Sequence, residues 1–178
     1  MVSIIIGGSG SGKSEYAEDL IQKYAKASES NLIYIATMKP HDQETEIRIQ
    51  KHRLMRQNKH FLTLECYTDL YKLQLPSHAA VLLECMSNLV SNEMFDSNGA
   101  KENTIKSVLT GVEKLIQQSA HLVVVTNNVF EAGCSYDAST REYLRVLGEI
   151  NCRMSNLAQE VIEVVHGIPI IIKHISCL

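Results

Sequence analysis

The chain has no tryptophan, only three prolines and no Cys-x-x-Cys pair. Its five cysteines are odd in number, which argues against a disulfide framework, and their spacing argues against a zinc site. This pattern is typical of reduced, mostly buried thiols in a cytoplasmic protein. Because no linker or low-complexity tract is visible, we expect residues 1–178 to form a single domain.

Long apolar runs and an excess of positive charge are also missing. No run approaches the roughly 20 residues that a membrane-spanning helix needs, and no basic stretch precedes an apolar segment at the N-terminus. We therefore expect neither a membrane span nor a signal peptide. The net charge of −3 and the pI near 6.2 argue against a nucleic-acid-binding surface.

Short apolar runs alternate with longer segments of helical periodicity. Several runs are apolar at successive positions, which is typical of parallel strands buried on both faces. The alternation predicts an α/β protein with a doubly wound, mostly parallel sheet, helices on both faces and a C-terminal hairpin. The expected strands are 2–6, 32–36, 61–64, 81–84, 122–126, 161–165 and 170–173. The expected helices are 14–28, 42–58, 86–95, 103–119 and 139–159.

A glycine-rich phosphate-binding motif, G-x-x-x-x-G-K-[ST], follows the first expected strand and opens the first expected helix. Its backbone N–H groups and the helix dipole would hold phosphate oxygens, Lys13 would bridge the terminal phosphates and Ser14 would hold Mg²⁺. A chance Gly/Ser linker is the alternative, but a strand and a helix flank the motif as a P-loop requires. The motif consists of Gly7, Gly8, Ser9, Gly10, Ser11, Gly12, Lys13 and Ser14.

Glu84 directly follows the apolar run 79–83. A carboxylate at the end of a buried parallel strand lies near the phosphates of a P-loop ligand, where it can help to position Mg²⁺. The alternative is a strand-end carboxylate that faces solvent. We favour the magnesium interpretation because an acid after an apolar run is the pattern that such sites need.

Arg48, His52 and Arg56 lie four residues apart in the expected helix 42–58 and therefore share one stripe. Two guanidiniums beside an imidazole would disfavour its protonation and leave a neutral nucleophile or base. From the spacing alone, a solvated basic face with a chance histidine is the favoured interpretation. The apolar residues expected to face the core are Ile47, Leu54 and Met55.

Taken together, these motifs resemble the bifunctional adenosylcobinamide kinase / adenosylcobinamide-phosphate guanylyltransferase family of cobalamin biosynthesis. The similarity covers nearly the whole chain. The phosphate loop is generic, whereas Ala-Thr followed by R-I-x-x-H-x-x-x-R is much more specific. The matching segments are 7–14, 34–37, 48–56, 82–85 and 125–127, together with the closing 167–169.

The resemblance implies two reactions. A nucleoside triphosphate, ATP or GTP, phosphorylates the aminopropanol hydroxyl of adenosylcobinamide. A histidine then takes GMP from GTP, releases pyrophosphate and passes the GMP to adenosylcobinamide phosphate. The matching histidine is His52, so the resemblance reverses the interpretation of that helix. It also implies a Mg²⁺ requirement and a homotrimer. The implied nucleotide-contacting residues outside the phosphate loop are Thr37, Arg53, Arg56, Glu65 and Glu84.

Some positions depart from the family pattern. Asn128 stands where the family usually has glutamate, and Arg145 and Cys152 replace other polar residues. We expect these departures to lie on one side of the substrate cleft and residues 131–138 to form a flexible loop. Two alternatives follow: a P-loop small-molecule kinase without guanylyl transfer, or a divergent nucleotide-binding protein that has lost catalysis.

Overall fold

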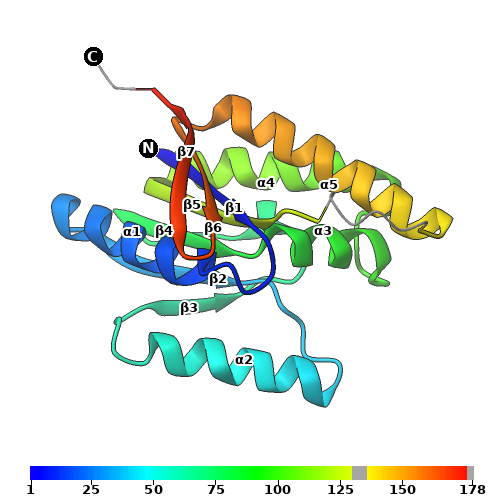
Figure 1. The fold of residues 1–178 in the computed structure, drawn as a ribbon, viewed down its shortest axis with the longest axis horizontal. Helices are drawn as coiled ribbons and strands as arrows, with labels where there is room; N and C mark the ends of the chain where they lie inside the picture. The colour runs from blue at the N-terminus through cyan, green and yellow to red at the C-terminus, as the bar shows by residue number, and fades with distance from the viewer. Residues whose placement is uncertain (130–135, 176–178) are drawn as a thin grey trace.

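The computed structural model describes residues 1–129 and 136–175, apart from the side chain of Met55. Most of the expected loop 131–138 therefore lies outside the described residues, as do Cys134 and Cys177. Figure 1 shows helices layered against a central twisted sheet. No helix in the described ranges is long and apolar enough to cross a membrane.

The sheet has seven strands in the order β3-β2-β4-β5-β1-β6-β7, and all pairs are parallel except the closing β6–β7 hairpin. Runs of apolar residues explain the parallel strands, because both of their faces are covered by helices. The predicted α/β class, parallel sheet and terminal hairpin are confirmed. The strands are β1 (Val2–Gly7), β2 (Asn31–Ala36), β3 (Leu62–Glu65), β4 (Ala79–Glu84), β5 (Ser119–Asn127), β6 (Glu160–Val165) and β7 (Ile168–His174).

Five α-helices surround this sheet among the described residues (Figure 1). α1 packs its apolar face on one side of the sheet, around Ile21, whereas α3, α4 and α5 cover the other side, around Leu89, Leu115 and Leu147. α2 lies apart from both layers, beyond β3 at the bottom of the view. The helices are α1 (Lys13–Ser28), α2 (Gln43–Arg56), α3 (Met86–Phe95), α4 (Thr104–Gln118) and α5 (Ala138–Leu157).

The register of the parallel strands gathers their carboxyl ends at one edge. Gly7 at the end of β1 pairs with Asn127 at the end of β5, and Ala36 at the end of β2 pairs with both Glu84 and Glu65. Segments that are distant in sequence therefore open onto one crevice, the usual ligand site of an open α/β sheet.

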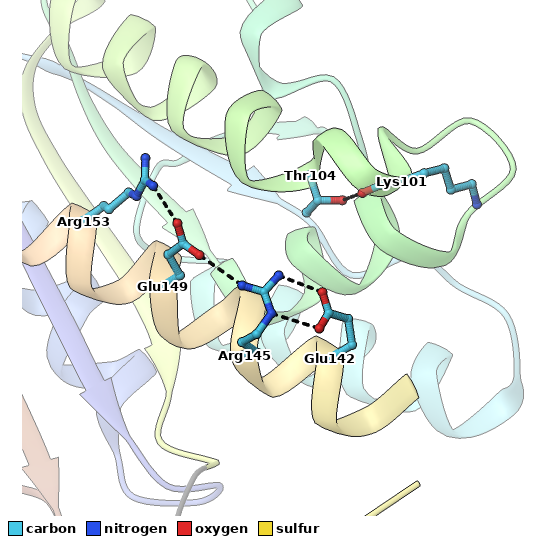
Figure 2. Close-up of polar contacts among 6 residues, drawn as sticks. All are labelled: Lys101, Thr104, Glu142, Arg145, Glu149 and Arg153. Atoms are coloured by element: carbon cyan, nitrogen blue, oxygen red, sulfur yellow. Dashed lines mark hydrogen bonds and ion pairs between the residues drawn. The ribbon is translucent and has the colours of Figure 1, made fainter. Parts of the chain in front are cut away.

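The outward face of α5 carries a ladder of ion pairs (Figure 2). Arg145 contacts Glu142 at 2.7 Å and Glu149 at 3.2 Å, and Glu149 also accepts from Arg153 at 2.6 Å. Exposed pairs at i,i+3 and i,i+4 spacing contribute little to stability, because water screens the charges. Arg145 therefore belongs to the solvent face of α5.

The expectation that apolar residues of α2 face the core is wrong for two of the three. Ile47 is 65% exposed and Leu54 is 70% exposed. The reason is that α2 turns its Arg48–His52–Arg56 stripe toward the crevice, so residues on other faces of the helix meet solvent. The third, Met55, has no described side chain.

Candidate active site

The phosphate loop makes a tight turn in which two glycines have positive φ angles. Gly10 and Gly12 have φ angles of 71° and 89°, in the left-handed region that favours glycine. Gly12 is the N-cap of α1, and the Lys13 ammonium folds back to donate to the Gly8 carbonyl at 3.0 Å. The loop therefore places the N-terminus of a sixteen-residue helix and a lysine cation at the carboxyl edge of the sheet, which is an anion-binding arrangement.

The β6–β7 turn packs against the phosphate loop and is hydrogen-bonded to it. The Gly167 N–H donates to the Ser11 carbonyl at 2.8 Å. A Cβ on Gly7 would lie 2.6 Å from the Val164 carbonyl oxygen, so the loop and the hairpin approach too closely for any side chain there. The hydrogen bond from Gly167 to the loop gives a structural reason for the Gly-Ile-Pro turn at residues 167–169.

Ser14 and Glu84 meet at the base of the crevice. The Ser14 hydroxyl donates to Glu84 Oε1, while Glu84 Oε2 is enclosed without a hydrogen-bond partner in the described part of the chain. Burial raises the pKa of the Glu84 carboxyl, and the Ser14 hydrogen bond and the Lys13 and Arg56 charges oppose that rise. An orphaned carboxylate oxygen beside a serine hydroxyl and a phosphate loop fits the oxygen ligands of Mg²⁺.

His52 lines the same cavity as the phosphate loop. Its Nδ1 is enclosed without a hydrogen-bond partner among the described residues. Burial lowers the pKa of His52, and the Arg56 charge lowers it further. Arg48 instead pairs with Glu44 on the exposed surface of the helix. The imidazole is therefore kept neutral mainly by burial.

Arg56 is buried one helical turn beyond His52. Its guanidinium carbon lies 3.4 Å from the centroid of the Tyr34 ring. The neighbouring Lys59 joins the end of α2 to α1, because its ammonium contacts the fully buried Glu18 at 2.8 Å. These contacts fix the C-terminal end of α2 against the phosphate-loop helix.

Arg53 and Glu65 form part of the outer rim of the cavity. The Arg53 guanidinium contacts Glu65 at 3.1 Å, and the Tyr67 hydroxyl donates to the other Glu65 oxygen at 2.8 Å. Both members of the ion pair are more than half exposed, so they can exchange this contact for one with a ligand at little cost.

Thr37 lies behind the site rather than in it. Its hydroxyl donates to the Cys85 carbonyl at 2.8 Å and accepts from the Cys85 N–H at 2.7 Å. It is fully buried and does not line the cavity, so its visible role is to hold the end of β2 against the segment after β4.

The cavity has a volume of about 800 Å³. It brings together residues 9–14 of the phosphate loop with His52, Arg53, Arg56 and Glu65 across the crevice, and Glu84 lies between them. The lining residues that had not been singled out as site residues from the sequence include Tyr34, Tyr67 and Asn88. Asn127, at the end of β5, also lines the cavity.

Three of the departures from the family pattern lie outside this cavity. Asn128, Arg145 and Cys152 are all absent from the cavity lining. Arg145 sits in the ion-pair ladder of α5, Cys152 is exposed, and the Asn128 amide donates to Glu163 at 3.3 Å. That these changes border the corrinoid side of the substrate cleft stays a prediction.

The fold and this cavity define a P-loop nucleotide-binding α/β protein. Among solved structures, the ATPase domain of G40P superposes with a TM-score of 0.56 at 11% identity, covering 97% of this chain and 76% of that chain. A likeness at this identity concerns the fold alone.

Sequence comparison identifies the family. The family described as cobinamide kinase / cobinamide phosphate guanyltransferase matches residues 3–172, and the chain belongs to it. The bifunctional adenosylcobalamin biosynthesis proteins CobU of Escherichia coli and Salmonella typhimurium are 32% and 33% identical, each alignment covering 97% of this chain and 100% of the relative. CobP of Pseudomonas aeruginosa, also described as a bifunctional adenosylcobalamin biosynthesis protein, is 26% identical over 97% of this chain.

Proposed function

We propose that the chain phosphorylates adenosylcobinamide and then transfers GMP from GTP to the product through a guanylylated His52. One observation supports the covalent step above all others: His52, whose pKa is lowered by burial, lines the same cavity as the phosphate loop. A neutral imidazole and a triphosphate site within one cavity supply the nucleophile and the electrophile of a nucleotidyl transfer.

In the kinase step, the aminopropanol hydroxyl attacks the γ-phosphorus, the bond to the β-phosphate oxygen breaks, and the nucleoside diphosphate leaves. Lys13 and the loop N–H groups stabilise the charge that develops on the phosphoryl oxygens. Ser14 and Glu84 would hold Mg²⁺, which supplies charge neutralisation on the triphosphate when bound.

In the guanylyl step, His52 Nε2 attacks the α-phosphorus of GTP and pyrophosphate leaves with the electrons of the broken P–O bond. A phosphate oxygen of adenosylcobinamide phosphate then attacks the same phosphorus, the P–N bond breaks, and adenosyl-GDP-cobinamide forms. Arg56, Arg53 and Glu65 line the cavity. In this proposal Arg56 would meet the charge on the α-phosphate, and Arg53 and Glu65 would contact the rest of the nucleotide.

The pH dependence of guanylylation tests the state of His52. Only the neutral ring attacks phosphorus, so the rate constant rises with pH through the pKa and is flat above it. Because burial and Arg56 lower this pKa from its usual 6.5, we expect the midpoint below pH 6.5 in single-turnover measurements. Below the midpoint the rate constant should fall about tenfold per pH unit.

Arg56→Met provides the matched comparison for this profile. Removing the positive charge removes one of the two main causes of the lowered pKa, so the midpoint should move to higher pH even though the rate itself falls. A wild-type midpoint above 6.5, or a midpoint that Arg56→Met leaves in place, would contradict the assigned environment of His52.

We further propose that the chain assembles as a homotrimer. Supporting apolar surface lies on β7, where Ile168, Ile170, Ile171 and Ile172 are each between 49% and 65% exposed. Several large apolar side chains exposed on an edge strand are typical of an association site. Light scattering after size exclusion should give three times the chain mass of 19.9 kDa, and Ile171→Glu should lower it. A wild-type monomer at micromolar concentration would refute the assembly.

A further inference from the structure

Arg56 is a buried cation without a salt bridge. It exposes 7% of its surface, and its Nη1 is enclosed with no hydrogen-bond partner among the described residues. None of the ion pairs within residues 1–129 and 136–175 includes it. Glu18 and Glu84 act on its charge only through space. Burying a guanidinium in this way is costly, so its position needs a specific support.

The support is the face of Tyr34. The guanidinium carbon lies 3.4 Å from the ring centroid, well inside the range of a cation–π contact. Tyr34 is 3% exposed near the middle of β2, and Phe61 meets its ring edge-on at a centroid distance of 6.0 Å and an angle of 74°. Strand and aromatic neighbour together hold the ring in one orientation.

Support by an aromatic ring leaves the N–H donors of the guanidinium unoccupied, whereas support by a carboxylate would occupy them. A carboxylate would accept from two guanidinium N–H groups and neutralise the charge. A ring face attracts the cation from one side of its plane and uses none of the in-plane N–H donors. Arg56 can therefore be held in place while its donors and its charge stay available to an anion in the cavity.

We propose that Tyr34 is a positioning residue for guanylyl transfer, whose ring holds the Arg56 guanidinium in place for the α-phosphate that His52 attacks. The positioning role rests on the proposed function of His52, whereas the contact between Tyr34 and Arg56 is independent of it. The ring and not the hydroxyl carries the role, so Tyr34→Phe retains it and Tyr34→Leu removes it.

A double-mutant cycle tests the assignment. The rate constant for the GMP adduct after rapid mixing with GTP and Mg²⁺ is measured for wild type, Tyr34→Leu, Arg56→Met and the double variant. A desolvated cation–π contact leads us to expect that Tyr34→Leu slows the wild type roughly tenfold or more but the Arg56→Met background less than about twofold. Tyr34→Phe should stay within about twofold of wild type, because its ring face remains.

The matched control is a second cation–π pair outside the cavity. Lys72 lies 5.5 Å from the centroid of the Tyr71 ring, and neither residue lines the site. Tyr71→Leu should leave the rate constant unchanged. Thermal unfolding is followed for each variant, and Tyr34→Met, which keeps more buried volume, replaces Tyr34→Leu if the latter unfolds.

Equal slowing by Tyr34→Leu in both backgrounds would overturn the proposal, because a general packing defect acts regardless of Arg56. Slowing by Tyr34→Phe equal to that of Tyr34→Leu would also overturn it. If the wild type forms no adduct, the proposed guanylyl transfer fails. In that case the same double-mutant cycle is measured with the GTP dissociation constant as the readout. The positioning role of Tyr34 is refuted if Tyr34→Leu and Arg56→Met change that constant independently of each other.

Discussion

Replacing His52 with asparagine is expected to abolish guanylyl transfer while phosphorylation of adenosylcobinamide stays within about threefold of wild type. Asparagine keeps a polar side chain on α2 but has no nitrogen lone pair that can attack phosphorus. Loss of a covalent nucleophile typically lowers the rate at least about 10³-fold. Chromatographic separation of the phosphorylated and GDP-linked corrinoid products measures both reactions in one mixture.

His41→Asn is the control for this substitution. His41 is exposed just before α2 and does not line the cavity, so both products should form at wild-type rates. If His52→Asn still yields the GDP-linked product, the transfer does not pass through this residue. If it abolishes phosphorylation as well, His52 contributes to the triphosphate site and not to the second reaction alone.

Lys13→Ala is expected to impair both reactions, because both use the same phosphate loop. The ammonium that now donates to the Gly8 carbonyl would meet the phosphoryl oxygens of a bound triphosphate. Removing one such preorganised group typically costs about 10²–10³-fold in rate. Steady-state kinetics of each reaction and calorimetric titration with GTP measure the loss.

Lys23→Ala gives the comparison on the same helix, since Lys23 is exposed in the middle of α1 and does not line the cavity. Its variant should bind GTP as the wild type does. An unchanged GTP affinity and turnover in Lys13→Ala, with thermal stability intact, would argue against the assigned phosphate loop.

The fold was predictable because its signals are local. Successive apolar residues such as those in β4 and β5 specify strands buried on both faces, and the phosphate loop specifies where β1 ends and α1 begins. Strand order is not a local property, since it depends on which crossovers pack best, and the sequence did not reveal that β5 lies between β1 and β4.

The site was predictable where one residue type at one position carries the chemistry. Lys13, Ser14 and Glu84 follow from the loop and from an acid at a strand end, whereas His52 needed the family resemblance. The support of Arg56 by Tyr34 joins residues 22 positions apart and has no local signal. Glu18 is an acidic residue near the start of its helix, yet it is fully buried and pairs with Lys59. The signal in the sequence that could have predicted this burial was its position one helical turn after Ser14, which places both residues on the same side of α1.

In the proposed mechanism, GMP resides on His52 between the two halves of guanylyl transfer. The most direct measurement is intact-protein mass spectrometry after incubation with GTP and Mg²⁺ at neutral pH, followed by acid treatment and peptide mapping. We expect a mass gain of one GMP, lost in acid as a phosphoramidate is, mapped to His52 and absent from His52→Asn. GTP binding without any adduct would contradict the account and favour a kinase without guanylyl transfer or a nucleotide-binding protein that has lost catalysis.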